Sequence, residues 1–232
     1  MSASAAAAVG GGLAAYNVAL HRVIPRRHHL ATNLVATALL VGSARAAGMG
    51  ATELGLAREQ HRRGLREGLI ASAAVVTAVA LAASPRRLRR RFADDRVRAR
   101  SGREAAYESL ARIPLGTALF EEVAFRGVLT GLLRRDMAPA AATAVSTGAF
   151  GLWHVLPTLD HRAGSPLLRS SGPVAAGLGA VAATVPAGVA FEALRRRSDS
   201  LLAPVLVHAA LNSSTYLAAQ VAHREQATGE TA

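Results

Sequence analysis

Long apolar stretches alternate with short polar ones along most of the chain. A helix that crosses a bilayer needs about 20 consecutive, mostly apolar residues. Stretches of that kind occupy residues 30–50, 68–84, 113–133, 138–156, 172–191 and 201–221, with a weaker one at 1–20. This pattern predicts an all-α protein, a polytopic transmembrane helical bundle of about six to eight spans, with seven favoured.

The segments between the apolar stretches are polar and mostly short. Segment 52–67 mixes both signs of charge, which is typical of an amphipathic helix at a membrane surface. Segment 85–112 is the longest and most basic connection. We expect a single transmembrane helical domain over residues 1–222 and a polar C-terminal tail over residues 223–232.

The composition is typical of a membrane protein and limits the kinds of covalent link and metal site that the chain can form. Hydrophobic residues make up 51% of the chain and aromatic residues only 4%, so a soluble core would be poorly filled. The mean hydropathy is +0.25. The chain has no cysteine, which excludes disulfides and thiolate metal sites.

All of the basic side-chain charge is carried by arginine, because the chain contains no lysine. A formal net charge of +12 is compatible with binding to nucleic-acid phosphates or with arginine-rich loops that fix membrane topology. The arginines cluster between apolar stretches, as at residues 85–91, and no aromatic residues that would stack on bases alternate with them. The pattern favours topology, and we expect no nucleic-acid partner.

The arginines also predict an orientation, because cytoplasmic loops carry more positive charge. With seven spans and an external N-terminus, the loops at 21–29, 85–112 and 157–172 and the C-terminal tail lie together on the cytoplasmic side. These segments hold more arginines than the opposite loops do. The orientation depends mainly on the 85–112 loop, whose placement does not change if the weak first span is lost.

Three polar clusters interrupt the apolar stretches, each in a different predicted span. They are Glu121, Glu122 and Arg126 in the first, Phe150 and His154 in the second, and His208 and Asn212 in the third. Ionisable residues inside a bilayer are costly and are usually functional. Two carboxylates, two imidazoles, a guanidinium and an amide are groups that a hydrolytic site needs.

The first cluster has the spacing of an ion pair on a helix. Glu122 and Arg126 are four residues apart, so they share a face and can pair. Such a pair would lower the free-energy cost of placing both charges in lipid and would hold the Glu122 carboxylate in place. Glu121 projects about 100° away around the helix, yet both carboxylates could reach one cavity if the helix is irregular. The alternative is a purely structural ion pair with a second glutamate that faces a loop.

The two histidines lie on separate predicted spans, which favours a shared site over two isolated polar residues of a core. Imidazole and carboxylate groups are suitable zinc ligands, and a catalytic zinc keeps one position open for water. His154, His208 and Glu122 are the candidate ligands, although no His-Glu-x-x-His motif fixes them. Asn212 can donate a hydrogen bond to an oxyanion.

Residue types missing from the predicted spans limit the mechanism. No aspartate lies in any of them, no serine stands in a Gly-x-Ser-x-Gly setting, and the chain has no cysteine nucleophile. For a hydrolase, water activated by a glutamate remains, with or without a metal. A proton-coupled transporter could use the same residues as a relay, but the sequence shows no inverted repeat of the kind that many transporters have.

In this order the three clusters resemble the CPBP family, which comprises CAAX prenyl proteases and bacteriocin-processing or self-immunity (Abi) membrane proteins. The family pattern is Glu-Glu-x-x-x-Arg, then Phe-x-x-x-His, then His-x-x-x-Asn, and this chain matches every position. The run 200–208 also resembles the family's lead-in to its last motif. The resemblance covers residues 110–217 well and the first half of the chain loosely.

The resemblance implies a glutamate-dependent intramembrane endopeptidase. By similarity, Glu121 is the base that activates water, and His154 helps to hold that water. His208 and Asn212 stabilise the oxyanion. A divalent metal, zinc in the first place, is usually ascribed to the family.

The same resemblance implies that Glu122 and Arg126 orient the site. The expected partners are the lipid bilayer and a membrane-embedded or lipid-anchored peptide or protein, of which a prenylated CAAX tail is one example. The expected location is the plasma membrane of a bacterium, with the site open toward the cytoplasm. The alternative is a non-catalytic protein that binds a membrane peptide or confers self-immunity against a bacteriocin.

Overall fold

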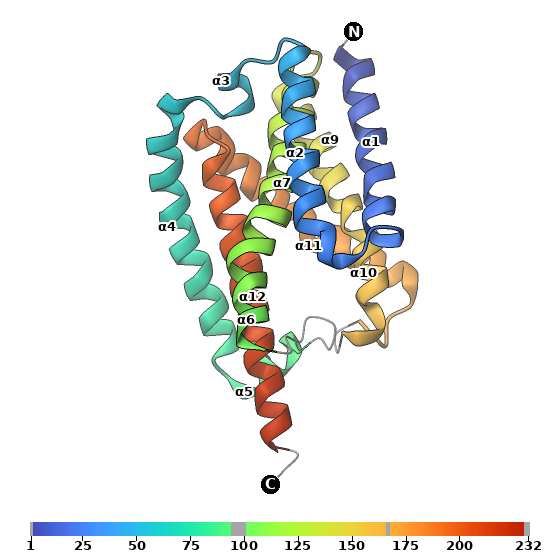
Figure 1. The fold of residues 1–232 in the computed structure, drawn as a ribbon, viewed down its shortest axis with the longest axis vertical. Coiled ribbons are helices and arrows are strands. Elements are labelled where there is room, and N and C mark those ends of the chain that lie inside the picture. Colours follow the sequence, from blue (N-terminus) through green and yellow to red (C-terminus); the bar gives the residue numbers. More distant parts are fainter. Residues whose placement is uncertain (1, 94–100, 166–167, 230–232) are drawn as a thin grey trace.

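The computed structural model describes residues 2–93, 101–165 and 168–229 (Figure 1). Every regular element in these ranges is helical, so the predicted all-α class is confirmed. The α-helices are α1 (Ser2–Arg22), α2 (His29–Ala46), α3 (Ala51–Leu54), α4 (Arg58–Ala83), α5 (Arg86–Arg89), α6 (Gly102–Tyr107), α7 (Leu119–Glu122), α8 (Thr130–Leu133), α9 (Pro139–Trp153), α10 (Val155–His161), α11 (Pro173–Ser198) and α12 (Leu202–Gly229). The π-helical stretches are η3 (Glu108–Ala118) and η4 (Val123–Leu129), and the short 3-10 turns are η1 (Arg26–His28), η2 (Arg90–Phe92) and η5 (Arg162–Gly164).

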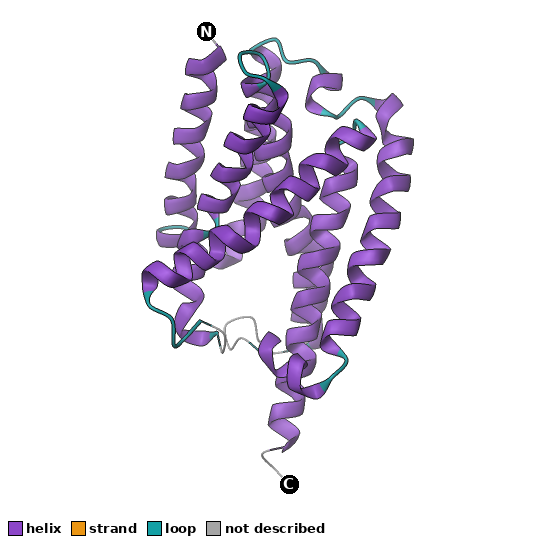
Figure 2. Ribbon diagram, turned by 180° about the vertical axis from the view of Figure 1, so that it is seen from behind, coloured by secondary structure: helices purple, strands orange, loops and turns teal. Residues whose placement is uncertain are grey.

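The long helices run alternately up and down the bundle (Figure 1). α1 descends from the N-terminus, α2 returns, α4 descends, and the segment from α6 to α8 forms one continuous ascending rod. α9 and α10 descend, α11 crosses obliquely behind the bundle, and α12 descends again (Figure 2). As a result η1, α5 and the end of α10 lie at the same end as the C-terminal part of α12, which is the grouping that the arginine distribution predicted.

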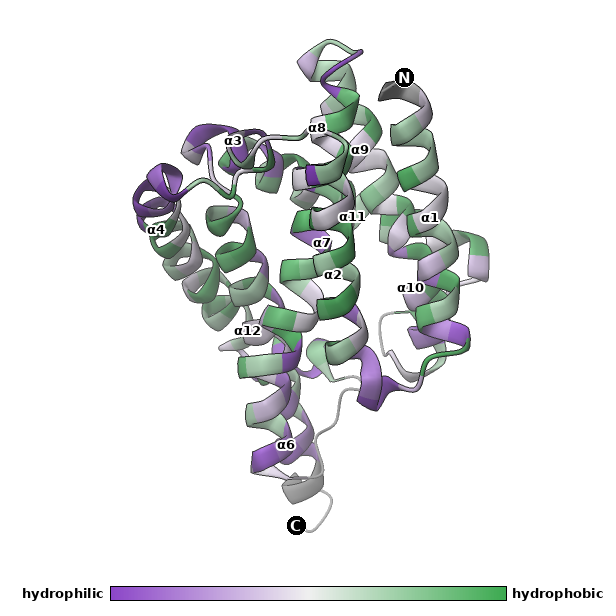
Figure 3. Cartoon of the chain, turned by 45° about the horizontal axis from the view of Figure 1, so that its top comes forward, coloured by the Kyte–Doolittle hydropathy of each residue, from purple (hydrophilic) through white to green (hydrophobic). Residues whose placement is uncertain are grey.

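Two helical segments are long and apolar enough to cross a membrane, judged by length and composition: Ala51–Ala83 and Pro173–Ser198. Most residues in their apolar windows are not buried inside the protein. Leu69 and Leu81 of α4 and Leu178 of α11, for example, are more than half exposed. Figure 3 shows apolar residues along the middle of the helices and hydrophilic ones toward their ends. Composition within the described residues thus supports two spans and does not establish six to eight.

Two of the other segments depart from a simple apolar span in geometry or length. The rod from α6 to α8 alternates between α- and π-helical stretches and carries the charged first cluster, and α9 has only 15 residues. The separate surface helix predicted over 52–67 is wrong, because α4 begins at Arg58 and continues to Ala83. Arginine, glutamate and glutamine favour helix, so the charged segment simply extends the apolar one. α12 likewise continues through part of the predicted polar tail to Gly229.

The rod from α6 to α8 lies at the centre of the bundle and holds the first cluster. All 7 residues of η4 are buried. The rings of Phe120 and Phe125 on the rod pack against those of Phe150 and Trp153 on α9, with centroids of contacting pairs 5.3 to 5.7 Å apart. Pro114 inside η3 has no backbone N–H, so a regular α-helical hydrogen bond is lost there. The π-helical stretches on both sides of α7 supply the irregular helix that two adjacent carboxylates need to serve one site.

A close helix contact fixes α12, which carries the third cluster. A Cβ atom on Gly64 of α4 would lie 2.5 Å from the Cβ atom of Ser200. Ser200 in turn accepts the backbone N–H of Leu202 through its hydroxyl and caps the start of α12. Small residues let helix backbones approach closely. The position of His208 therefore depends on a contact outside the site.

Candidate active site

The three clusters meet inside the bundle. They contribute Glu121 and Glu122 from α7, Arg126 from η4, His154 directly after α9, and His208 and Asn212 from α12. Glu122, Arg126 and His208 are 0%, 2% and 3% exposed. We call these last three residues the buried triad.

Glu122 is the centre of the buried triad. Arg126 Nη1 donates to Glu122 Oε1 over 3.1 Å, and His208 Nδ1 lies 2.8 Å from the same oxygen. Since an ionised carboxylate can only accept, His208 donates from Nδ1. The Arg126 guanidinium also lies over the ring of Phe150, 3.9 Å from its centroid, in a cation–π contact. The predicted ion pair of Glu122 and Arg126 is therefore present.

His154 is oriented by the end of α9. The helix stops at Trp153, and the backbone N–H of His154 bonds to Gly151 instead of continuing the α-helical pattern to Phe150. The carbonyl oxygen of Phe150 is then 2.8 Å from His154 Nδ1. A carbonyl only accepts, so His154 carries its proton on Nδ1 and leaves a lone pair on Nε2. The Phe-x-x-x-His spacing thus places the carbonyl four residues before the imidazole that it orients.

Glu121 lies between the two histidines. Its Oε1 atom accepts a hydrogen bond of 3.1 Å from Trp153 Nε1. Its Oε2 atom has no hydrogen-bond partner among the described residues and faces Nε2 of His208 at 3.7 Å and Nε2 of His154 at 3.8 Å. These separations are too long for direct hydrogen bonds. Glu121 therefore keeps one buried oxygen without a partner in the described part of the chain, between two imidazole nitrogens.

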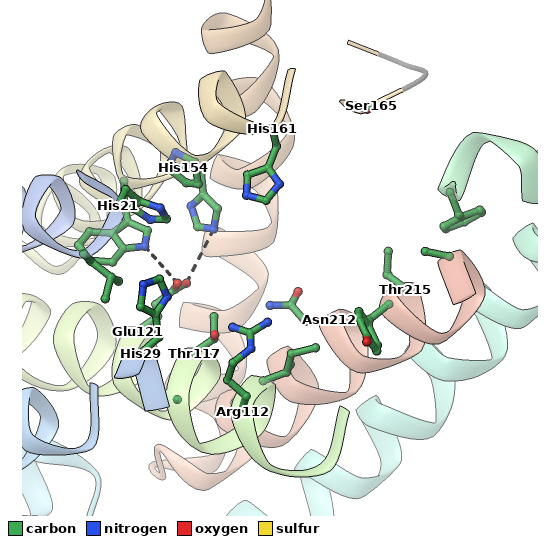
Figure 4. Close-up of a pocket in the computed structure, with 18 of the residues that line it drawn as sticks. His21, His29, Arg112, Thr117, Glu121, His154, His161, Ser165, Asn212 and Thr215 are labelled. Atoms are coloured by element: carbon green, nitrogen blue, oxygen red, sulfur yellow. Dashed lines mark hydrogen bonds and ion pairs between the residues drawn. The ribbon is translucent and has the colours of Figure 1, made fainter. Parts of the chain in front are cut away.

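A cavity of about 780 Å³ opens beside Glu121, as Figure 4 shows. Glu121, His154 and Asn212 line it, whereas the buried triad does not. Apolar side chains such as Leu20 and Ile113 form part of the wall. Ligand pockets in proteins have volumes of about 300 to 1,000 Å³ and mostly apolar walls. A ligand in this cavity would contact Glu121 and Asn212 but not Glu122.

The cavity also has a basic lining that the sequence did not predict. His21, His29, His161, Arg91 and Arg112 line it, and Glu121 is its only lining carboxylate among the described residues. Figure 4 shows several of these side chains around the space in front of Glu121. They come from five different elements, so no local motif joins them. Only the fold brings them to one cavity.

Trp153 is the functional residue that the motifs did not single out. Its indole N–H fixes one oxygen of Glu121, and its own backbone carbonyl accepts a 2.9 Å hydrogen bond from Asn17 of α1. A buried indole N–H needs an acceptor. Trp153 is the sole tryptophan and directly precedes His154. Its indole N–H therefore indicates that a polar acceptor lies nearby.

The candidate metal ligands His154, His208 and Glu122 do not converge on one point. Glu122 lies against Nδ1 of His208, while His154 lies on the other side of that ring, near Glu121. Among the residues that the structure describes, no three histidine, aspartate or glutamate side chains are placed to hold a metal ion. This arrangement does not suit a zinc ion held by that set.

Comparison with known proteins agrees with the motifs. Residues 106–214 match the family model described as type II CAAX prenyl endopeptidase Rce1-like, and all of the predicted site residues fall inside this range. No curated protein and no solved structure matches the chain. The family is one of peptidases, which supports a protease function. The resemblance to the CAAX protease family is confirmed: over residues 106–214 the chain carries a domain of the Rce1-like type II CAAX prenyl endopeptidase family.

Proposed function

We propose that the protein is an intramembrane endopeptidase in which water activated by Glu121 cleaves a peptide bond of a membrane-associated peptide. The observation that carries this proposal is the unpartnered Oε2 atom of Glu121, which lies at a cavity wall and faces two imidazole nitrogens. The family match supports the reaction class.

The first step is activation of water between Glu121 and His154. A water there donates one proton to Glu121 Oε2 and directs its other O–H to the lone pair on His154 Nε2. Trp153 holds Oε1 and so fixes the direction of the carboxylate. As the water oxygen attacks the carbonyl carbon of the peptide, its proton passes to Glu121.

The second step is stabilisation of the oxyanion that forms on the carbonyl oxygen. Asn212 donates from its amide into the cavity, while His208, which does not line the cavity, acts through Glu121, whose Oε2 atom faces its Nε2 atom at 3.7 Å. Glu122 accepts from Nδ1 of His208 and so fixes the orientation of the ring, while Arg126 holds Glu122 in place. The tetrahedral intermediate collapses when the C–N bond breaks and the proton on Glu121 moves to the leaving amine.

The membrane arrangement that we propose has seven spans, with the site open toward the arginine-rich end. The up-and-down order of the long helices supports this number (Figure 1). The cavity is lined in part by Leu88, Arg91 and Phe92 of α5 and η2, which lie at the end where the basic loops gather. The positive-inside rule makes that end cytoplasmic. A lipid-anchored or membrane-embedded peptide would then reach Glu121 from the cytoplasmic side.

The decisive experiment compares Glu121→Gln with the wild type on quenched fluorescent peptides, with and without a prenylated CAAX end. The protein is purified in detergent and its fold is checked by thermal unfolding. We expect kcat to fall about 100- to 10,000-fold in Glu121→Gln, the usual contribution of a general base. Glu59→Gln removes the same charge from an exposed position on α4 and should leave kcat unchanged. Equal activity of Glu121→Gln and wild type would contradict the proposal, and folded wild type that cleaves no peptide would favour a peptide-binding or self-immunity protein.

A chelator arm of the same experiment tests the zinc expectation. No step above uses a metal, because the candidate ligands do not converge. Unchanged cleavage after chelation would support water activated by Glu121 without a metal. Loss of cleavage that zinc restores would show a metal-bound form in which the ligands are rearranged.

A further inference from the structure

A second hollow, of about 470 Å³, lies where α3 meets the ends of α8 and α11. It shares no lining residue with the cavity beside Glu121. Its charged lining consists of Arg126, Arg134, Arg135, Arg195, Glu53 and Asp199. Neither the family pattern nor the proposed reaction gives this hollow a role.

The carboxylates around the hollow are already engaged. Both oxygens of Glu53 accept from Arg135, each over 2.8 Å. Arg134 pairs with Glu192. Asp199 forms an ion pair of 3.3 Å with an arginine of α4. These carboxylates are therefore each paired with an arginine other than Arg195.

Arg195 is the least compensated of these arginines. Arg195 is only 7% exposed, and its side chain forms no ion pair with any described residue. Its Nη2 atom donates to the backbone oxygen of Glu53 over 3.0 Å. Gly55, at φ +75°, packs so closely that a Cβ atom there would lie 2.6 Å from Arg195 Cζ. A buried guanidinium is thus held in one position without a direct ion pair to a described residue, although the carboxylates of Glu192 and Asp199 lie near enough to act on its charge.

Hydrogen-bond donors outnumber acceptors at the hollow. Arg126 Nη2, Arg134 Nε and Arg195 Nε are buried and have no acceptor among the described residues. The carboxylate oxygens nearby that also lack a partner belong to Glu122 and Glu192, neither of which lines the hollow. Buried N–H groups without acceptors are costly. The planar guanidinium fork matches the oxygens of a phosphate or carboxylate.

We propose that this hollow binds a small oxyanion, namely a phosphate group, between Arg195 and Arg134. The hollow lies toward the polar ends of the helices, at the end opposite the arginine-rich loops (Figure 3). Both a lipid headgroup and free inorganic phosphate present this chemistry. The site is separate from the catalytic cavity, so it does not depend on the proposed peptidase reaction.

The test is the thermal unfolding midpoint of the whole protein in detergent as inorganic phosphate replaces chloride at constant ionic strength. We expect a saturable rise in the wild type, because a ligand that binds only the folded state stabilises it. In Arg195→Gln the rise should vanish or need about tenfold or more phosphate for half-saturation. Arg197→Gln is the matched control, since Arg197 is on the same helix, is 71% exposed and does not line the hollow.

A second variant and a second probe complete the test. Arg134→Gln should lose the response as well, which keeps the proposal testable even if Arg195→Gln does not fold. Dihexanoyl phosphatidic acid replaces inorganic phosphate in the second arm. A response to both probes supports a site for any phosphate group, and a response to the lipid alone supports a headgroup site. No saturable response to either probe, or an undiminished response in Arg195→Gln and Arg134→Gln, would overturn the proposal and leave a water-filled hollow.

Discussion

Glu121 and Glu122 are adjacent, yet their surroundings give them different tasks. Glu122 is 0% exposed and accepts from both Arg126 and His208. Glu121 lines the cavity and has one oxygen without a partner among the described residues. Glu121 is therefore available to a water, whereas Glu122 is committed to holding Arg126 and His208 in place.

The hydrogen bond from Trp153 to Glu121 leads to a prediction. Trp153→Phe keeps an aromatic ring in the core but removes the N–H that fixes Glu121 Oε1. A hydrogen bond to a charged group contributes about 1.5 to 3 kcal/mol, so kcat should fall about tenfold or more. KM should change less than kcat, because phenylalanine keeps an aromatic ring in the cavity wall that Trp153 lines. Steady-state kinetics on a cleaved peptide checks this, and an unchanged kcat would show that the indole does not orient the base.

The pairing inside the buried triad predicts a loss of stability instead of a loss of rate alone. Arg126→Met leaves Glu122 buried without its cation, which should cost about 3 to 5 kcal/mol. The yield of folded protein and the unfolding midpoint in detergent should drop. The double variant Arg126→Met with Glu122→Gln removes both charges and should recover part of the midpoint. A single variant as stable as wild type would mean that Glu122 does not need Arg126.

At the residue scale the sequence predicted the members of the site better than their contacts. Spacings of four residues identified Glu122 with Arg126, and Phe150 with His154, because such spacings have a fixed meaning in a helix. The proton positions on the histidines depend on acceptors that only the fold supplies. The ligand set proposed for zinc failed to converge for the same reason, since His208 turns one nitrogen to each glutamate.

At the scale of helices, the close packing of α4 against the start of α12 at Gly64 leads to a prediction. Gly64→Ala introduces a Cβ atom 2.5 Å from Ser200 Cβ, so α12 must shift away from α4. Overpacking of this kind costs about 1 to 3 kcal/mol, and kcat should fall as His208 moves. Gly42→Ala in α2 is the control, because nothing lies within 4 Å of a Cβ atom there. Unfolding midpoints that are equal for both variants would contradict close packing at Gly64.

The long apolar stretches predicted where helices lie, but not where the helices begin or how they bend. The stretch 113–133 is helical as expected, although the rod already begins at Gly102 of α6. Its π-helical turns were not predicted, because Pro114 alone does not determine how the backbone rearranges around it. The charged segment 52–67 and the apolar stretch 68–84 differ in composition, which predicts two separate elements. In the structure most of both belongs to α4, since the charged residues also favour helix.

The orientation of the whole molecule can be tested directly because the chain has no native cysteine. Ser84 and Ala138 are exposed and suit single-cysteine substitution, since Ser84 follows the end of α4 and Ala138 precedes the start of α9. These two helix ends lie at opposite ends of the bundle (Figure 1). In intact cells, a membrane-impermeant maleimide should label Ala138→Cys, while Ser84→Cys should react only after permeabilisation. The reverse pattern would invert the topology, and labelling of both from outside would exclude the proposed seven spans.

At the scale of the molecule, the order of the helices was predictable and the cavities were not. Alternating apolar and basic segments give the up-and-down path, because each basic loop returns the chain to the same end. The hollow beside α3 draws Glu53, Arg134 and Arg195 from three parts of the chain with no common motif. Such a site depends on how α3, α8 and α11 meet, which composition does not specify.

The ion pair between Glu122 and Arg126 has a consequence for biosynthesis. His208, the other partner of Glu122, lies 86 residues later in the chain, so at about 5 to 20 residues per second it leaves the ribosome roughly 4 to 17 seconds afterwards. Arg126 is only four residues away and is present as soon as the rod forms. In the proposed seven-span arrangement, we therefore expect the translocon to meet a neutralised pair and not a bare carboxylate. Arg126 would then help Glu122 to enter the bilayer before His208 is synthesised.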